Sequence, residues 1–368
     1  MIKIKSIEVY QLDLPIKEGK YSWSHGNSVS VFDSSLVKIN TNQNIVGLGE
    51  VCTLGPAYLP AYPEGVRTGI KKFGKFLIGL DPTNLTEINS VMDSNLKGHN
   101  YVKSPIDMAC WDILGKYNEQ PVWKFLGGKF GKSVDLYRAI SQEDPKIMTR
   151  KVKGYKKEGY TKFQLKVGGD PYEDIERIKL VRSILDKKDI LVADANTGWL
   201  MHDALRVIRA TEHLDIYYEQ PCMTYEESLS IRRKTKNPFI LDENIDSINS
   251  FLRAYHDQAM DIINIKISKL GGLTKSKLLR DLCVQLGVAM TIEDSWGGDI
   301  ATAAISHLAH STPEKYRFSS TDFNSYNTLS YSKGSPKRKN GKFIASDDYG
   351  LGLSINERVI KKPLFEIK

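Results

Sequence analysis

Five charged side chains recur at nearly constant intervals in the second half of the chain: Lys166, Asp194, Glu219, Asp242 and Lys266. Each one ends a short apolar run of the kind that forms a buried parallel strand, which is expected to be apolar throughout. The intervals of 28, 25, 23 and 24 residues each fit one strand, one helix and their connections. In a β/α barrel the chemistry lies at the carboxyl ends of the strands, so these side chains are predicted to meet at one mouth.

The three acidic residues of this series, Asp194, Glu219 and Asp242, predict a cation site. Carboxylates crowded at one place repel each other unless a cation lies between them. A ligand set made only of carboxylate oxygens suits a hard cation, for which Mg²⁺ is the best choice. The alternative is that each acid caps the helix that follows it. Capping explains a single position well, but it does not explain three positions in register.

The two lysines, Lys166 and Lys266, end the second and sixth predicted strands and would face each other across the mouth. A substrate carboxylate held by the cation would then present its α-carbon between two amines. One lysine could remove a proton, and the other could deliver one to the opposite face. A nearby cation lowers the pKa of a lysine toward the range that a general base needs. The alternative is a pair of structural salt bridges with the acids.

Short apolar strands alternate with amphipathic helices from about Ser133 onward, and this pattern predicts a barrel. The predicted strands are Val134–Arg138, Phe163–Val167, Ile190–Asp194, Ile216–Glu219, Phe239–Asp242, Ile262–Lys266, Ala289–Glu293 and Tyr316–Ser319. The predicted helices include Pro171–Leu185, His202–His213, Ile245–His256 and Thr274–Gly287. A doubly wound open sheet is the competing fold, but it usually carries an early glycine-rich phosphate loop, which this sequence lacks.

The N-terminal part has a different, α+β character. Strands are predicted at Ile4–Leu14, Ser35–Thr41 and Ile45–Val51, followed by helices at Gly65–Ile78 and Ser104–Lys116. The fold class is therefore α/β. It comprises an α+β domain over residues 1–128, a (β/α)8-type, TIM-like barrel over 129–328, and a segment over 329–368 that returns to the first domain, with strand-like stretches near Phe343 and Leu351.

Composition excludes several classes of protein. Of 368 residues 41% are hydrophobic and 26% charged, and no apolar run approaches the ~20 residues of a membrane helix. The first five residues lack the order of a signal peptide, and four scattered cysteines indicate reduced thiols, so a cytoplasmic protein is expected. The net charge of +8 admits nucleic acid as a partner. However, the basic run at 333–342 contains glycine and proline and is interpreted as a solvated turn, so nucleic acid is not expected as a partner.

Several segments give the sequence a specific resemblance to the enolase superfamily, and within it to the muconate-lactonizing-enzyme subgroup. They are Phe163–Gly168, Ala193–Asn196, Tyr218–Pro221, Leu241–Glu243 and Asn264–Ile267. The resemblance covers essentially the whole chain and implies that the first domain caps a modified barrel. It also implies that Asp194, Glu219 and Asp242 bind one Mg²⁺ ion, which stabilises an enediolate after α-proton removal. Lys166 and Lys266 match the two acid/base lysines, and the subgroup implies a homo-oligomer.

Three further segments, Gly55–Tyr58, Gly98–Asp107 and Glu293–Asp299, resemble members that act on proline derivatives, namely hydroxyproline betaine epimerases and cis-3-hydroxy-L-proline dehydratases. This resemblance implies that Tyr58, Asp294 and Phe323 surround the substrate nitrogen. An acid pairs with an ammonium group, and aromatic faces attract a quaternary nitrogen. The alternative is that Tyr58 and Phe323 are ordinary packing residues. The further substrate-binding positions expected are Gln164, Asn196 and Trp296.

At two positions the sequence differs from residues that are common in related branches of the superfamily. Gln164 stands where many subgroup members carry a lysine, and Asp294-Ser295 stands where the mandelate-racemase branch has a histidine. The leading prediction is an epimerase or racemase that moves the α-proton of a proline-type amino acid or betaine, a small-molecule carboxylate. The alternative is dehydration of cis-3-hydroxy-L-proline on the same scaffold. A binding protein or inactive relative is the third possibility, which the retained acids and lysines disfavour.

Overall fold

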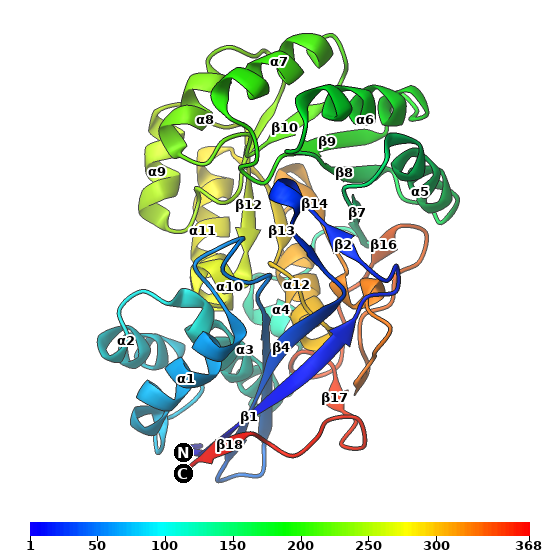
Figure 1. The fold of residues 1–368 in the computed structure, drawn as a ribbon. Coiled ribbons are helices and arrows are strands. Elements are labelled where there is room, and N and C mark those ends of the chain that lie inside the picture. The colour runs from blue at the N-terminus through cyan, green and yellow to red at the C-terminus, as the bar shows by residue number, and fades with distance from the viewer.

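The strand-and-helix alternation forms one eight-stranded parallel sheet in the computed structural model, which describes all residues from 1 to 368 (Figure 1). Each strand pairs with the next one along the chain. The strands are β7 (Tyr137–Ile140), β8 (Lys162–Lys166), β9 (Ile190–Asp194), β10 (Tyr217–Glu219), β11 (Phe239–Leu241), β12 (Ile262–Lys266), β13 (Ala289–Glu293) and β14 (Arg317–Ser320). No ladder joins β14 to β7, so the barrel is nearly closed. The predicted barrel is confirmed.

Helices lie around the outside of this sheet in Figure 1. Local sequence sets where several of them begin, because Asp144, Asp170, Thr224 and Ser247 each accept a hydrogen bond from the first turn of the helix that follows. The helices of the barrel are α5 (Pro145–Lys157), α6 (Pro171–Ser183), α7 (Met201–Thr211), α8 (Tyr225–Arg232), α9 (Ile248–His256), α10 (Ile267–Leu270), α11 (Leu273–Leu286) and α12 (Asp299–His310).

The N-terminal domain is an antiparallel sheet packed against helices. Its strand order is β18-β1-β4-β5, formed by β1 (Ile4–Pro15), β4 (Val31–Thr41), β5 (Val46–Cys52) and the chain's last strand, β18 (Phe365–Ile367). Its helices are α1 (Pro63–Phe73), α2 (Leu85–Asn95) and α3 (Asn100–Tyr117). Strand β5 and α3 approach closely because Gly49 has no side chain: a Cβ there would lie 1.8 Å from the Pro105 carbonyl oxygen.

Short elements complete the chain. They are β2 (Tyr21–Ser22), β3 (Ser28–Val29), α4 (Val122–Phe125), β6 (Val134–Asp135), β15 (Ser332–Lys333), β16 (Lys342–Phe343) and β17 (Ser354–Ile355), with 3₁₀ turns at Ser24–Gly26, Gly74–Leu77, Glu314–Tyr316 and Phe323–Tyr326. The strand expected near Phe343 is present as β16, which pairs with β6. Near Leu351, Gly350 forms an isolated bridge with Pro121, and the short strand β17 follows at Ser354–Ile355 and pairs with β15.

The first barrel strand also differs from the prediction. The apolar run at 134–138 divides into β6 and β7, and the backbone NH of Leu136 between them donates to the Gly341 carbonyl at 2.8 Å. The residues before Tyr137 therefore pair with the C-terminal segment, and only β7 joins the barrel. A single-sequence pattern cannot distinguish these two partners, because both require an extended apolar chain.

Buried carboxylates of the N-terminal domain join it to the barrel. Asp107 on α3 accepts from the backbone NH of Thr274, in the first turn of α11, at 3.0 Å. Glu50 on β5 accepts from the NH groups of Gly298 and Ala301, at the start of α12, each at 2.9 Å. Helix N-termini carry partial positive charge, so these contacts favour the ionised acids. The largest apolar cluster includes residues of both domains, and a second cluster lies within the N-terminal domain alone.

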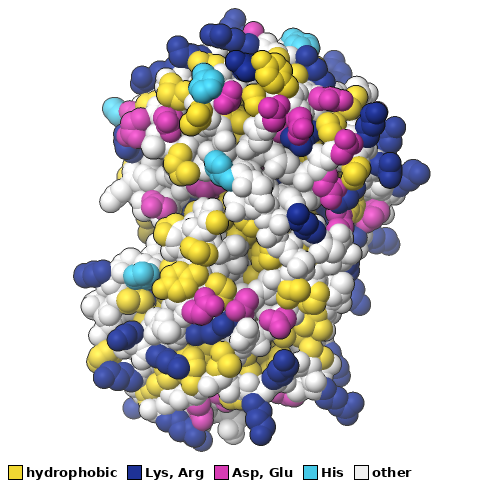
Figure 2. Space-filling model, viewed as in Figure 1, with side chains coloured by type: hydrophobic (Ala, Val, Ile, Leu, Met, Phe, Trp, Pro, Cys, Tyr) yellow, Lys and Arg dark blue, Asp and Glu magenta, His cyan; other side chains and the backbone are white.

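Charged side chains of both signs are distributed over the visible face in Figure 2. The basic run at 333–342 lies on the barrel, where Arg338 donates to Glu158 at 2.8 Å. All four cysteines are buried free thiols. None of the helices combines the length and the apolar character needed to cross a membrane.

Candidate active site

The predicted site residues occupy matching positions in the barrel ladder. Lys166 on β8 pairs in register with Asp194 on β9, and Asp194 pairs with Glu219 on β10. Lys266 on β12 pairs in register with Glu293 on β13. Residues in register on neighbouring parallel strands point to the same side of the sheet. All five side chains are buried, so the carboxyl end of the barrel holds a ring of ionisable groups.

Glu219 is the acid of this ring that contacts no cation. Its two carboxylate oxygens accept only from neutral amides, at 3.1 Å from Gln164 and 2.7 Å from Asn264. Burial, followed by the charges of Asp194 and Asp242, raises its pKa well above the ordinary range of a glutamate. A carboxylate in this environment gains free energy from any cation that reaches it.

The other two predicted metal ligands are paired with lysines. Asp194 contacts the Lys166 ammonium, and Asp242 contacts that of Lys266 and accepts from Lys269 at 2.9 Å. Although burial opposes ionisation, the two lysines hold the pKa of Asp242 below its usual range. Burial also works against the charge on Lys166, but the nearby carboxylates, Asp194 foremost, raise its pKa well above the ordinary value.

The chemistry of this donor set fits a divalent cation. Carboxylates at the mouth outnumber the ammonium groups beside them, since the buried Glu219 and Glu293 and the half-buried Glu243 lie near Asp194 and Asp242. These acids do not converge into a compact ligand cluster here, because lysine side chains contact two of them. Hard oxygen donors in excess of positive charge are what Mg²⁺ requires. The residues that would hold the ion are Asp194, Glu219 and Asp242.

A cavity lies between the two lysines, which both line it. Its walls include all of the predicted substrate-binding residues, namely Tyr58, Gln164, Asn196, Asp294, Trp296 and Phe323. The Tyr58 hydroxyl, on the loop after β5, donates to Asp242 at 3.0 Å and contacts Lys266. Asn196 donates to Glu243 at 3.0 Å. The sequence-predicted residues are therefore brought together in one place.

Asp294 lines the cavity but already has hydrogen-bond donors. It accepts from the backbone NH groups of Ser268, at 3.1 Å, and Ser295, at 2.7 Å. Burial raises the pKa of Asp294 to about 6 even so. A buried carboxylate with this pKa is available to pair with an ammonium group near neutral pH.

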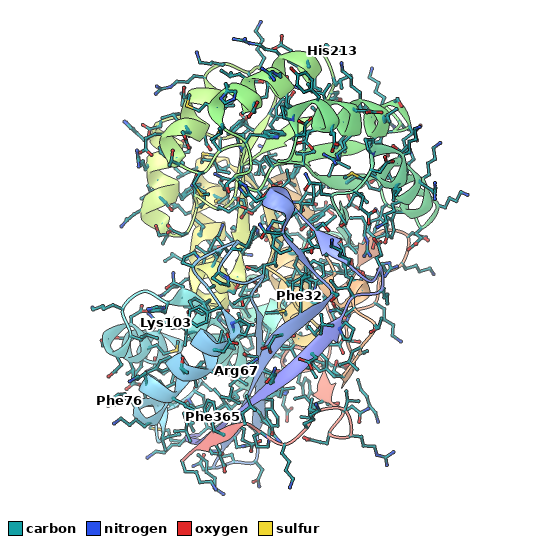
Figure 3. All side chains as sticks on the ribbon, in the orientation of Figure 1. Phe32, Arg67, Phe76, Lys103, His213 and Phe365 are labelled. Atoms are coloured by element: carbon teal, nitrogen blue, oxygen red, sulfur yellow. The ribbon has the colours of Figure 1, made fainter.

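Trp296 is both a cavity wall and the centre of an aromatic cluster. Its ring stacks on Phe32 at a centroid distance of 4.3 Å and lies 4.8 Å from Phe323 and 5.0 Å from Tyr21. Phe32, labelled in Figure 3, lies on β4 of the N-terminal domain. The cavity wall is thus built jointly by both domains. Phe323 both lines the cavity and packs in this cluster, so the two interpretations of that residue are compatible.

Sequence reasoning missed several cavity and ring residues: Glu293, Lys269, Glu243, Asn264, Tyr21, Trp23 and Tyr137. Glu293 had a usable signal, because the predicted strand Ala289–Glu293 ends on a charge like the other five. The aromatic residues had none, since their positions come from long-range packing.

His307 and His310, one helical turn apart, do not face a shared ligand. Nδ1 of His307 accepts from the backbone NH of Trp123 at 2.9 Å, and its Nε2 lies 3.2 Å from the Leu351 carbonyl oxygen. His310 Nε2 lies 3.2 Å from the Gly131 carbonyl oxygen. Both side chains bind backbone and fasten α12 to its neighbours, which agrees with their interpretation as helix residues.

Comparison with known proteins places this architecture in a family. Residues 24–127 match the mandelate racemase / muconate lactonizing enzyme N-terminal domain, and residues 148–359 match the enolase C-terminal domain-like family. The chain therefore belongs to the enolase superfamily, in the muconate-lactonizing-enzyme subgroup, and the predicted resemblance is confirmed.

Individual relatives carry different activities. A cis-3-hydroxy-L-proline dehydratase of Roseibium aggregatum is 58% identical over 363 residues, which is 99% of each chain. An N-succinyl-L-Arg/Lys racemase of Bacillus cereus is 30% identical and covers 84% of this chain and 85% of its own. A solved enolase-superfamily structure from Roseovarius nubinhibens, complexed with magnesium, is 34% identical, covers 100% of both chains and superposes with a TM-score of 0.93.

The chain is thus an enzyme of a superfamily whose members act on small carboxylates. The epimerase prediction is not confirmed by these relatives, because racemases and epimerases are the more distant ones.

Proposed function

We propose that this enzyme dehydrates cis-3-hydroxy-L-proline, with Mg²⁺ as its cofactor. The observation that carries the proposal is the pair of lysines facing one cavity from β8 and β12, Lys166 and Lys266, combined with 58% identity to a dehydratase of that substrate. Asp294 and the aromatic walls are suited to the ring ammonium group. The proposal departs from the epimerase expected from sequence, which is the second candidate.

The stereochemistry of the substrate matches a site with two lysines. In cis-3-hydroxy-L-proline the hydroxyl group and the carboxylate lie on the same face of the ring, so the α-hydrogen lies on the other face. One lysine can remove the α-proton while the opposite lysine donates a proton to the departing hydroxyl group. In the trans isomer the hydroxyl group and the α-hydrogen lie on the same face of the ring. A single lysine would then have to remove the α-proton and also protonate the hydroxyl group.

The bond changes balance without a further reactant. The Cα–H bond breaks and its proton passes to one lysine amine; the electron pair forms the Cα–Cβ double bond, and the Cβ–O bond breaks. The hydroxyl oxygen takes a proton from the other lysine and leaves as water. The enamine then becomes the cyclic imine, a pyrroline-2-carboxylate. Positioned proton transfer of this kind contributes about 10²- to 10⁴-fold to a rate.

Asp194, Glu219 and Asp242 are the residues that would hold Mg²⁺. When bound, the ion supplies positive charge that stabilises the negative charge developing on the substrate carboxylate. Gln164 and Asn264 orient Glu219 through their amide groups, and they hold it in place without adding charge.

The test is incubation of the protein and Mg²⁺ in D₂O with cis-3-hydroxy-L-proline, trans-3-hydroxy-L-proline, 4-hydroxyproline betaine and L-proline, followed by NMR. We expect the cis isomer to yield the pyrroline carboxylate, and the trans isomer to lose water about 10²- to 10⁴-fold more slowly. Deuterium at the α-carbon of the betaine, without water loss from the cis isomer, would support the epimerase instead. Absence of both reactions with all four compounds would exclude proline derivatives as substrates.

A further inference from the structure

The two lysines of the cavity have different surroundings. Lys166 contacts one carboxylate, that of Asp194. Lys266 contacts Asp242 and also lies 3.6 Å from Oε1 of Glu293. Asp194 and Asp242 are both candidate metal ligands, whereas Glu293 is not. Lys266 therefore has an acidic neighbour that a metal ion would not share.

Glu293 is held in a defined orientation by its neighbours. It ends β13, pairs in register with Lys266 and is 1% exposed. Its Oε2 accepts a hydrogen bond from the hydroxyl of Tyr137, another cavity residue, on β7. Its Oε1 has no hydrogen-bond donor, although this atom is fully buried. A buried carboxylate oxygen without a hydrogen-bond donor costs free energy of folding, and such an oxygen in a native structure calls for an explanation. The nearest positive charge is the Lys266 ammonium group.

Lys166 has no counterpart to this residue. The strand on its other side is β7, where the ladder residues beside β8 are Tyr137, Arg138, Ala139 and Ile140. None of these is acidic. The ring of ionisable groups is therefore asymmetric: it offers a second acid on the side of Lys266 and none on the side of Lys166.

From this geometry we propose that Glu293 is a positioning residue for Lys266, and that it keeps the Lys266 amine directed into the cavity. This role rests on the proposed function, because it matters only if Lys266 transfers a proton. Asp242 also contacts Lys269, so its carboxylate is shared between groups. Glu293 gives Lys266 a second carboxylate contact, on the side of β13, and the hydrogen bond from Tyr137 holds Glu293 in place.

Because of this asymmetry, a positioning role of Glu293 can be distinguished from a general structural role, which would affect both faces of the cavity equally. Proline has no leaving group, so exchange of its α-hydrogen in D₂O reports proton transfer alone. L- and D-proline present that hydrogen to opposite faces of the cavity. Exchange is measured for both enantiomers with the wild-type Mg²⁺-loaded enzyme and with Lys266→Ala, which identifies the enantiomer whose proton Lys266 removes.

We expect Glu293→Gln to slow exchange of that same enantiomer by about 10- to 100-fold, as is usual for groups that orient a functional side chain. Exchange of the other enantiomer should stay near the wild-type rate. The matched control is Glu50→Gln, which alters another fully buried carboxylate that has no lysine contact; it should affect both enantiomers alike. Circular dichroism confirms that each variant is folded.

Equal loss of exchange for both enantiomers in Glu293→Gln, or no loss for either, would overturn the positioning role while leaving the proposed function intact. Wild-type enzyme that neither exchanges proline nor dehydrates cis-3-hydroxy-L-proline would overturn the proposed function, and this role with it. Glu293→Asp keeps a carboxylate but places it farther from the Lys266 amine. We therefore expect this variant to exchange the affected enantiomer faster than Glu293→Gln does, although more slowly than the wild type.

Discussion

Glu50 provides the clearest quantitative link between the N-terminal domain and the cavity wall. Its side chain is fully buried and accepts four hydrogen bonds: from the Gly298 and Ala301 NH groups at 2.9 Å, from the Tyr331 hydroxyl at 2.6 Å and from the Ser34 hydroxyl at 2.8 Å. The segment Asp294–Trp296, which forms part of the cavity wall, lies just before these anchored NH groups. Glu50→Gln replaces one acceptor oxygen with an NH₂ group.

The two hydroxyl donors can rotate toward other acceptors, but the two backbone NH groups cannot. In either orientation the glutamine amide places its NH₂ against one of them, and an unsatisfied buried donor costs about 1–3 kcal/mol. Loss of the negative charge at the start of α12 adds about 0.3–1 kcal/mol. Against this, burial raises the pKa of Glu50, so removing its charge recovers part of the cost. The net expectation is destabilisation by about 2 kcal/mol.

Thermal and urea unfolding monitored by circular dichroism measure this change. For a chain of 368 residues, a loss of about 2 kcal/mol should lower the Tm by about 3 °C. Glu50→Ala, which leaves both backbone NH groups without an acceptor, should lower it further. The control is Glu173→Gln, whose side chain is 61% exposed and which should change stability by less than about 1 kcal/mol. If Glu50→Gln proves as stable as this control, or more stable than the wild type, the hydrogen-bond reasoning is refuted.

Further expectations concern titration, metal binding and catalysis. Burial lowers the pKa of His307 to about 3. Below about pH 6.5 the unfolded state takes up a proton at this residue and the folded state does not, so His307 should cost about 2 kcal/mol of stability at pH 5. His307→Gln should therefore flatten the pH dependence of the free energy of unfolding between about pH 7 and 4. Glu219→Gln removes a buried charge that contacts no cation, so it should raise the Tm of the metal-free protein. The same change should abolish the stabilisation by Mg²⁺, which in the wild type should reach about 2.7 kcal/mol at an Mg²⁺ concentration of 100 times the Kd. An unchanged Mg²⁺ effect in calorimetry would exclude Glu219 as a ligand. Lys166→Ala and Lys266→Ala should each lower kcat for dehydration by about 10²- to 10⁴-fold, and full turnover by either would contradict the two-lysine mechanism.

Sequence reasoning succeeded where a repeated spacing encodes a position in space. A charge at the end of each predicted strand, from Lys166 to Lys266, locates the ring because a parallel barrel brings successive strand ends together. The same rule would have included Glu293. Lys269 lies beyond its strand end, on α10, so strand-end spacing cannot place it against Asp242.

Features that depend on distant segments were beyond the reach of sequence patterns. The aromatic cluster of Trp296 draws its members from β2, β4 and the turn at 323–326, which meet only when both domains pack together. The anchoring of α12 by Glu50 likewise depends on contact between segments about 250 residues apart. An isolated glutamate in a strand carries no sign of such a partner.

The pairing of β18 with β1 has a consequence for how the protein is made. The residues Phe365–Ile367 cover the outer edge of the first strand, and the two chain ends lie side by side in Figure 1. During synthesis, β1 emerges before the barrel, and its partner β18 emerges after it. This edge of the N-terminal sheet therefore stays open until β18 has been made, and an open edge is a site where strands of other chains can pair. Pairing of β18 with β1 closes that edge.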